Sequence, residues 1–517
     1  MTIPSKLRRP LRASRDTAAS QESRLDDWGP FLFYTACILI ALLTLFPYQI
    51  LPSETVEHRQ EPFFLWFFEK YPDWRDVFLN VLLFVPFGFG LGWRLDKWKF
   101  RWPVALVLTC AASGAFSFCI ELTQNFMPTR ASSWFDVLAN SAGGPLGWIL
   151  FRRFGYRIGQ LLSCFLDNFL RILSAQAMAA AFIVYAALGI VASIPLSLEA
   201  NLSNWNLSYP LVIGNVPNGE YPWHGQIFEL TIADRAVDAA EVPDVFQNGL
   251  ASMAGGNIVA SYGRTSPRNT QDGTDHFPEL HWTPQGTTDA GLKAGLLPGL
   301  GWMQTESAAV TVQKRIRDAN QFSVYVVCSA IRTSSYGPAW MVTLAPDADQ
   351  RNLALGQQLS HLVFRLRTST TGIYGQPPEY RISKFFLTAG TRRILFTYDG
   401  AALRSYWDGR RGYAMELGPG AALFRHLRQL RQFETPGYKA LYYGLIFVPL
   451  GCALALATRI SKRISALAVG CGLFVPSALL EPILEGLSRR PLYPGNVLLG
   501  IGLTTASYAF LRRYLPR

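Results

Sequence analysis

The sequence predicts a multidomain membrane protein in which an α-helical transmembrane bundle of about eight helices is joined to an all-β jelly-roll sandwich. Three observations support this fold class. Long apolar stretches occur in two groups along the chain. A long segment rich in Gly, Asn, Thr and Pro separates the two groups. Half of the 517 residues are hydrophobic and 16% are charged, a balance between that of a soluble domain and that of a pure membrane bundle.

Eight apolar stretches have the length that a membrane-spanning helix needs, roughly 20 residues. They lie near residues 30–52, 77–93, 102–124, 134–151, 172–197, 438–457, 464–482 and 493–511. The first stretch is too long for a cleaved secretory signal, so we expect it to remain as an anchor. The predicted domains are a basic tail (1–29), a first transmembrane domain (30–155), a fifth transmembrane helix (172–198), a β-sandwich (199–435) and a three-helix segment (438–513).

The net charge, formally +12 at pH 7, is concentrated in short segments beside the apolar stretches. This placement follows the positive-inside rule and argues against nucleic-acid binding, in which Lys and Arg neutralise phosphates. We expect a multi-pass protein of the cytoplasmic (inner) membrane with the lipid bilayer as partner. Both termini and the loops 94–101 and 152–171 are predicted to be cytoplasmic, and residues 199–435 extracytoplasmic. Arg489 and Arg490 are the exception, because they fall on the predicted outer side.

The long polar segment carries the pattern of a β-sandwich. Hydrophobic and polar residues alternate over 321–328 and 392–398, which is typical of half-buried strands. The pairs Asp399-Gly400 and Asp408-Gly409 favour tight hairpin turns. Several short strands with turn signals between them predict a sandwich or jelly roll.

Metal and cofactor sites are not predicted. Cys328 is the single cysteine in the polar segment, so an internal disulfide is excluded there. The six histidines show no metal-ligand spacing, and no phosphate-binding or dinucleotide-binding loop occurs. We therefore predict no cofactor and no metal.

An internal repeat links the two groups of apolar stretches. The segment 84–88 (FVPFG) recurs as 447–451 (FVPLG). Further along, Glu121, Arg130 and Asp136 are matched in step by Glu481, Arg490 and Asn496. The last three helices therefore resemble a degenerate second copy of predicted helices two to four. The alternative is chance similarity between apolar segments.

Polar residues in the first copy form a candidate site at the predicted outer membrane surface. The set is Asp76, Asn80, Glu121, Gln124, Arg130, Asp136 and Asn140. Residues four apart share a helical face, and ionisable groups near the hydrocarbon usually face a partner or a water-filled cavity. A structural explanation stays open: the two aspartates interact with helix dipoles, and Arg130 neutralises Glu121.

These residues carry a family resemblance. The motifs are 80–88 (NVLLFVPFG), 120–124 (IELTQ), Arg130 and 136–144 (DVLANSAGG), in this order. Together they resemble the VanZ-like family, named for a teicoplanin-resistance protein, over about residues 30–155. The resemblance implies a bacterial polytopic membrane protein of the cell envelope, linked to glycopeptide antibiotic tolerance and without a settled reaction.

The second copy departs from this pattern. Asn80, Gln124, Asp136 and Asn140 are matched there by Tyr443, Leu484, Asn496 and Gly500. We therefore expect any activity to reside in the first copy.

The polar segment resembles the laminin-G-like or concanavalin A-like jelly rolls. Segments 206–215, 223–227 and 232–235 are similar to closing strands, and 321–324, 340–344, 351–357, 364–368 and 406–409 to opening and middle strands. Because this order is reversed, we expect a circular permutation. Such folds often bind glycans, which makes Trp340, Tyr374 and Trp407 candidates for stacking on sugar rings. Their alternative role is in the core, where large rings are usually buried.

These observations favour a membrane protein whose outer jelly-roll domain binds or senses an envelope glycan or glycopeptide, with a lipid-linked sugar as a further candidate partner. The first alternative is a membrane enzyme acting on lipid-linked envelope intermediates at the outer leaflet. In it, Glu121 or Asp136 is the general acid or base and Arg130 holds a phosphate. No nucleophile is evident. The second alternative is a structural or adhesion scaffold.

Overall fold

A computed structural model of the chain describes residues 28–49, 73–127, 130, 132–263, 280–284, 301–388, 390–429, 431, 434–461 and 463–514. Residues 1–27 of the predicted basic tail and 53–72 of the first predicted outer loop lie outside the described residues. The chain divides into two compact units. Unit 1 comprises 1–186, 445–476 and 499–517, and unit 2 comprises 187–444 and 477–498.

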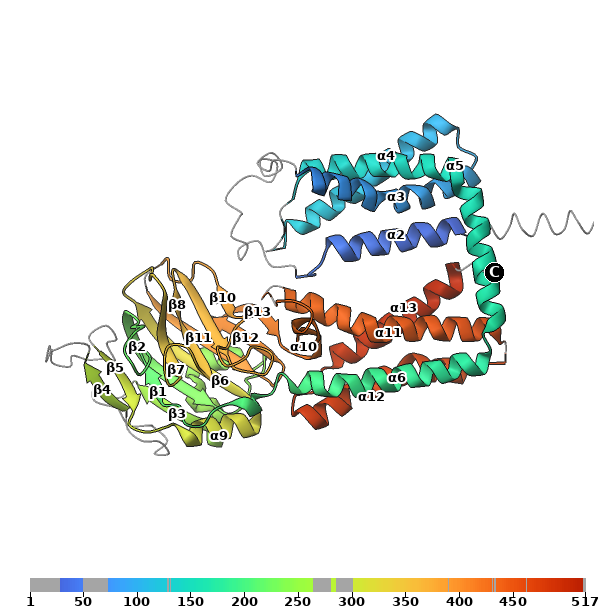
Figure 1. The fold of residues 1–517 in the computed structure, drawn as a ribbon. Helices are drawn as coiled ribbons and strands as arrows, with labels where there is room; N and C mark the ends of the chain where they lie inside the picture. Colours follow the sequence, from blue (N-terminus) through green and yellow to red (C-terminus); the bar gives the residue numbers. More distant parts are fainter. Residues whose placement is uncertain are drawn as a thin grey trace, which may run out of the picture. The chain divides into compact units, whose positions relative to one another are not determined.

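Helices occupy all eight predicted places (Figure 1). They are α2 (Trp28–Thr44), α3 (Trp74–Lys97), α4 (Trp102–Gln124), α5 (Trp134–Ile172), α6 (Ala175–Leu198), α11 (Thr435–Ile460), α12 (Ala466–Ser488) and α13 (Pro494–Tyr514). Among the described residues, α3, α4, α6, α11 and α12 are long and apolar enough to cross a membrane, and α2 is a shorter apolar helix. The chain is therefore a membrane protein with several spanning helices.

In unit 1, helices α3 and α5 approach each other through glycines. A Cβ atom built on Gly88 would lie 1.9 Å from the carbonyl oxygen of Gly144, and one on Gly147 would lie 2.1 Å from that of Val85. Small residues let membrane helices pack backbone to backbone. The glycines in the FVPFG and NSAGG motifs thus have a packing role.

Helix α5 corrects the prediction that residues 152–171 form a loop. The helix continues without a break to Ile172, and Figure 1 shows that it turns part of the way along its length. Its second half has a buried side that packs against the start of α2, where Trp28 Nε1 donates a hydrogen bond to Ser163 Oγ at 2.8 Å. Basic residues suit a loop and a helix equally, so their charge does not distinguish the two.

Unit 2 contains a sandwich of two antiparallel sheets, consistent with a jelly roll. The strands are β1 (Leu211–Ile213), β2 (Gly225–Ala233), β3 (Ile258–Gly263), β4 (Leu280–Pro284), β5 (Gly301–Thr305), β6 (Phe322–Ala330), β7 (Pro338–Leu344), β8 (Leu353–Gln358), β9 (His361–Leu366), β10 (Tyr380–Ile382), β11 (Thr391–Tyr398), β12 (Ala402–Trp407) and β13 (Arg410–Glu416). One sheet has the order β10-β9-β8-β7-β1-β5-β4, and the other β13-β12-β11-β6-β2-β3. The early strands β1 and β2 thus occupy interior positions.

The strands and the hairpin turn predicted from local sequence patterns in this domain are confirmed. The two strongest alternating segments form β6 and β11, which pair in antiparallel register. Asp408 and Gly409 join β12 to β13 with φ values of 48° and 80°, as a type I′ hairpin turn requires. Between the sheets, Phe364 and Phe396 stack with ring centroids 4.5 Å apart. The remaining helices are α7 (Val242–Asn248), α8 (Leu250–Ala254), α9 (Val310–Ala319) and α10 (Pro419–Arg425).

Candidate functional site

The first-copy polar residues connect neighbouring helices of unit 1. Asn80 Nδ2 donates to Asp136 Oδ1 at 2.8 Å and joins α3 to α5. Asn140 Nδ2 donates to Ser117 Oγ at 2.8 Å and joins α5 to α4. Asp76 is exposed in the first turn of α3, where a negative charge interacts favourably with the helix dipole.

Of the other first-copy residues, Glu121 and Gln124 lie in the last turn of α4, and Arg130 lies between α4 and α5. Glu121 is buried, and its Oε2 accepts a hydrogen bond at 2.9 Å from the backbone N–H of Ser133, the N-cap residue of α5. Gln124 Nε2 donates to the carbonyl oxygen of Thr44 at 2.8 Å, and Arg130 Nε donates to that of Phe46 at 3.1 Å. Glu121 therefore accepts a hydrogen bond from a backbone N–H, and Arg130 donates one to a backbone carbonyl. This arrangement supports a structural role for the cluster.

The matching residues of the second copy converge within unit 2. Glu481 is only 1% exposed, and its carboxylate accepts hydrogen bonds from Arg490 Nη2 at 2.9 Å and from Asn496 Nδ2 at 3.3 Å. The hydroxyl of Tyr443, which replaces Asn80, also donates to this carboxylate. All four side chains are buried. The repeat thus identified three residues that are in contact. They lie in the second copy, whereas the sequence predicted that any activity resides in the first copy.

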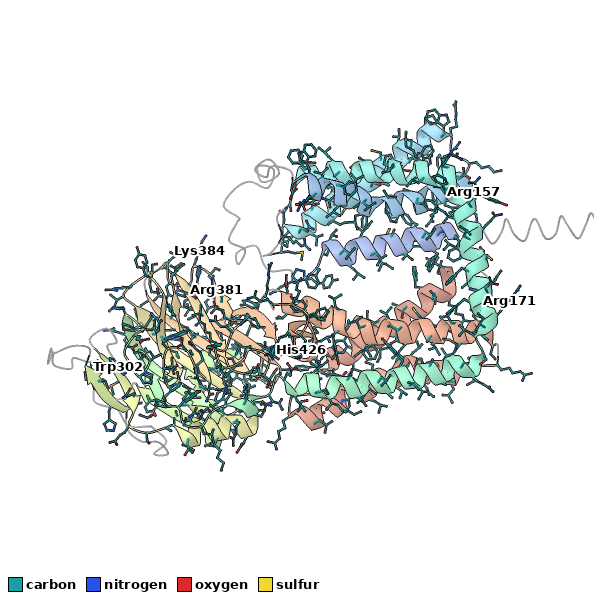
Figure 2. All side chains as sticks on the ribbon, viewed as in Figure 1. Arg157, Arg171, Trp302, Arg381, Lys384 and His426 are labelled. Carbon is teal, nitrogen blue, oxygen red and sulfur yellow. The ribbon has the colours of Figure 1, made fainter. Side chains whose placement is uncertain are left out.

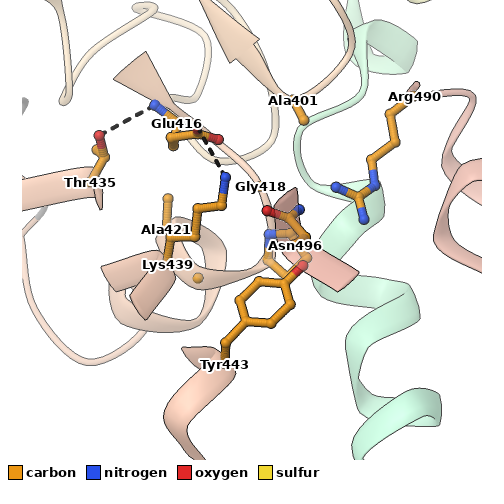
Figure 3. A pocket seen from close by; sticks show the side chains of 11 residues that line it. Ala401, Glu416, Gly418, Ala421, Thr435, Lys439, Tyr443, Arg490 and Asn496 are labelled. Carbon is orange, nitrogen blue, oxygen red and sulfur yellow. Dashed lines mark hydrogen bonds and ion pairs between the residues drawn. The ribbon is translucent and has the colours of Figure 1, made fainter. Parts of the chain in front are cut away.

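A small pocket with a cavity volume of about 20 Å³ adjoins this cluster (Figure 3). Arg490, Asn496 and Tyr443 line it together with polar side chains from the end of β13 and the start of α11. The other lining residues are Glu416, Thr435, Lys439, Ala401, Gly418, Pro419, Gly420 and Ala421.

The pocket combines paired charges with an available donor. Lys439 Nζ lies 3.2 Å from Glu416 Oε1. The ring of Tyr493 lies 5.6 Å from Lys439 Nζ and 5.4 Å from the guanidinium carbon of Arg490, distances that favour cation–π attraction. Arg490 Nε is buried and has no hydrogen-bond partner among the described residues. A ligand oxygen at this position would satisfy it.

Lys439, Glu416 and Thr435 were not among the site residues predicted from the sequence. One signal was present, because Lys439 is a charge near the start of an otherwise apolar helix. Glu416 ends a strand, and nothing in its local sequence associates it with a helix that follows later. Tertiary structure brings these residues together.

The three aromatic candidates have different environments. Trp340 is completely buried, with the guanidinium carbons of Arg351 and Arg365 each 5.0 Å from its ring, so it presents no face to a sugar. Trp407 is partly buried against the core. Tyr374 is 52% exposed and keeps a ring accessible.

Glu379, which pairs with Arg365 beside Trp340, is expected to make the stability of unit 2 depend on pH. Glu379, nearly buried, accepts a hydrogen bond from Arg365 Nε at 2.8 Å and another from Arg381. Burial alone would raise the pKa of Glu379. The charge of Arg365 and the hydrogen bonds from both arginines outweigh that effect, so the pKa lies below its ordinary value of 4.5.

We predict that unit 2 loses stability as the pH falls below about 4.5. A carboxyl whose pKa is lowered in the folded state stabilises that state above its unfolded pKa, and the contribution disappears as the pH falls through the folded pKa. Thermal unfolding of the full chain across an acidic pH series measures this. Glu379→Gln should flatten the profile, whereas the exposed control Glu220→Gln should not. Identical profiles would refute the assignment.

A comparison with known protein families identifies the first group of helices. Residues 31–155 match the family model described as VanZ/LLP1. No curated protein and no solved structure matches the chain. The matched region runs from α2 to the middle of α5 and contains the first-copy cluster. The pocket residues lie outside it.

Proposed function

We propose, from the premise that residues 31–155 form a VanZ/LLP1 domain, that this membrane protein binds an oxygen-rich head group of a cell-envelope molecule in the unit 2 pocket. The observation that carries the proposal is the buried Arg490 Nε, which has no acceptor among the described residues and belongs to a side chain that lines the pocket together with Lys439. Binding sites commonly place a few polar groups so that they converge on the ligand.

The lining chemistry selects the ligand class. Lys439 and Arg490 are cationic donors, Thr435 and Asn496 donate and accept, and Glu416 accepts. Sugar hydroxyls and phosphate or carboxylate oxygens satisfy this set, and charge-assisted hydrogen bonds are the stronger ones. The class includes envelope glycans, glycopeptides and lipid-linked sugars.

The position of the lining residues favours a membrane-attached ligand. Lys439 lies in the second turn of α11, and Arg490 follows closely after α12 ends at Ser488. Both helices are long and apolar enough to cross a membrane, so their ends are expected near the head groups. We place the pocket on the extracytoplasmic side of the cytoplasmic membrane, following the positive-inside prediction. A jelly roll related to laminin-G or concanavalin A domains, with Tyr374 exposed, would add a second contact to a glycan.

Binding by the full chain in detergent tests the proposal. The probe is a polyprenyl-diphosphate-linked disaccharide, and its dissociation constant is measured by native mass spectrometry for wild type, Lys439→Gln and Arg489→Gln. Loss of a charged hydrogen bond of about 1.5–3 kcal/mol should weaken binding about ten- to a hundredfold in Lys439→Gln. Arg489 is exposed and does not line the pocket, so its variant should bind like wild type. Equal affinity of all three proteins, or no binding by wild type, would reject the pocket as the site.

Growth under glycopeptide antibiotics tests the biological role. A deletion strain is complemented with wild type, Lys439→Gln or the double variant Glu121→Gln/Asp136→Asn, at matched membrane levels. The proposal expects tolerance to be restored by wild type and lost in Lys439→Gln. The double variant should restore it, because the first-copy cluster connects helices and does not line the pocket. The opposite result would move the working site to the first copy.

A further inference from the structure

The second half of α5, residues 152–172, links two parts of the membrane bundle. The first half of α5 packs against α3 and α4, both of which are long and apolar enough to cross a membrane. Shortly after α5 ends, α6 begins at Ala175 and meets the same criterion. A helix that connects two crossing segments starts and ends at the same membrane surface. Figure 1 shows the second half of α5 turned away from the direction of the first half.

This segment has an exposed apolar stripe. Ile158, Leu161, Phe165, Phe169 and Ile172 are all exposed and follow one another at intervals of three or four residues, so they share one helical face. Leu161, Phe165 and Ile172 are 70%, 69% and 84% exposed. The side next to the stripe packs against α2 through Leu162, Ser163 and Leu166, so the stripe is not the core-facing side of the helix.

Basic residues border the stripe. Arg153, Arg157 and Arg171 are exposed, and the helical period places all three on one side of it. Figure 2 shows Arg157 and Arg171 on this part of the helix. From 152 to 172 the sequence has four arginines and one aspartate, a formal net charge of +3.

We infer that residues 152–172 form an interfacial helix that binds the anionic phospholipids of one membrane leaflet. The stripe enters the boundary between head groups and acyl chains, and the three arginines hydrogen-bond lipid phosphates. Amphipathic helices with aromatic and aliphatic residues on one face and arginines on the other bind membranes in this way. The flanking membrane helices hold the segment at the required depth. This inference is independent of the pocket.

The depth of residues 152–172 in the membrane is tested with fluorescent labels on the full chain in vesicles. A cysteine-free background carries Leu161→Cys on the stripe or Gln160→Cys, an exposed position on the basic side. Each cysteine is labelled with an environment-sensitive dye and exposed to lipids with brominated acyl chains. Strong quenching at position 161 and weak quenching at position 160 are expected. Equal quenching at the two positions, or none at 161, would overturn the interfacial placement.

Lipid selectivity is tested in mixed phosphatidylglycerol and phosphatidylcholine vesicles. The ratio of the two lipids retained by the purified protein is compared between wild type and Arg153→Gln/Arg157→Gln/Arg171→Gln. Each arginine near an anionic surface should account for roughly a fivefold preference, so the triple variant should lose most of the enrichment. Arg410→Gln/Arg411→Gln, on exposed positions of β13, is the matched control and should retain it. Equal enrichment in wild type and the triple variant would overturn the lipid assignment.

Discussion

Replacing Gly88 by Val is expected to disrupt the packing of α3 against α5 and to unfold much of the VanZ/LLP1 domain. The first added carbon alone would lie 1.9 Å from the carbonyl oxygen of Gly144. Overpacking a core usually costs about 1–3 kcal/mol, and we expect the upper end or more because a backbone atom cannot rotate away. The melting temperature and size-exclusion profile of the full chain in detergent measure this.

The matched control is Gly502→Val in α13. Apart from its chain neighbours and the nearby backbone of its own helix, a Cβ at Gly502 has no atom of the described residues within 4 Å, so the same change should leave the protein folded. Similar melting temperatures for the two variants would contradict the packing role. A lower melting temperature in Gly88→Val only would show that packing between helices accounts for the glycine of the FVPFG motif.

Replacing Arg490 by Ala should be the most damaging change near the pocket. Glu481, which is 1% exposed, would lose its ion-pair partner, and breaking a buried pair in this way costs about 3–5 kcal/mol. Thermal unfolding of the full chain in detergent should show the loss. The neighbouring exposed variant Arg489→Ala should change stability by less than about 1 kcal/mol.

A double variant distinguishes the effect of the buried charge on stability from the effect of Arg490 on ligand binding. Glu481→Gln/Arg490→Gln removes both charges and keeps groups that hydrogen-bond, so most of the stability should return. Binding of the head-group probe should stay weak, because the cationic donor is absent. If the double variant is as unstable as Arg490→Ala, packing of the arginine stem and not its charge holds this region together.

The two copies of the repeat use similar residues differently. In the first copy, Glu121 accepts from the backbone at the start of α5 and Arg130 donates to the backbone near the end of α2. In the second copy, Glu481 and Arg490 pair directly beside a pocket. Loss of the family pattern in the second copy therefore does not mean loss of a polar site.

Physical rules that act along the chain made the helices and turns predictable. Membrane thickness sets the length of an apolar stretch, so eight stretches predicted eight helices. A type I′ hairpin turn needs φ above zero at both central positions, which Asp-Gly favours, so Asp408-Gly409 predicted the turn between β12 and β13. The repeat likewise matches Glu481, Arg490 and Asn496 to the first-copy residues from the sequence alone.

By itself the sequence determined the membrane class, the positions of the helices, the β-sandwich and the matching polar residues. The tertiary structure decided which side chains are exposed and which meet. Trp340 is buried because of the sheet face it occupies, α5 continues because its far half packs on α2, and the pocket joins Glu416, Lys439 and Arg490 from separate elements. These outcomes depend on contacts between distant segments, which periodicity and composition do not encode.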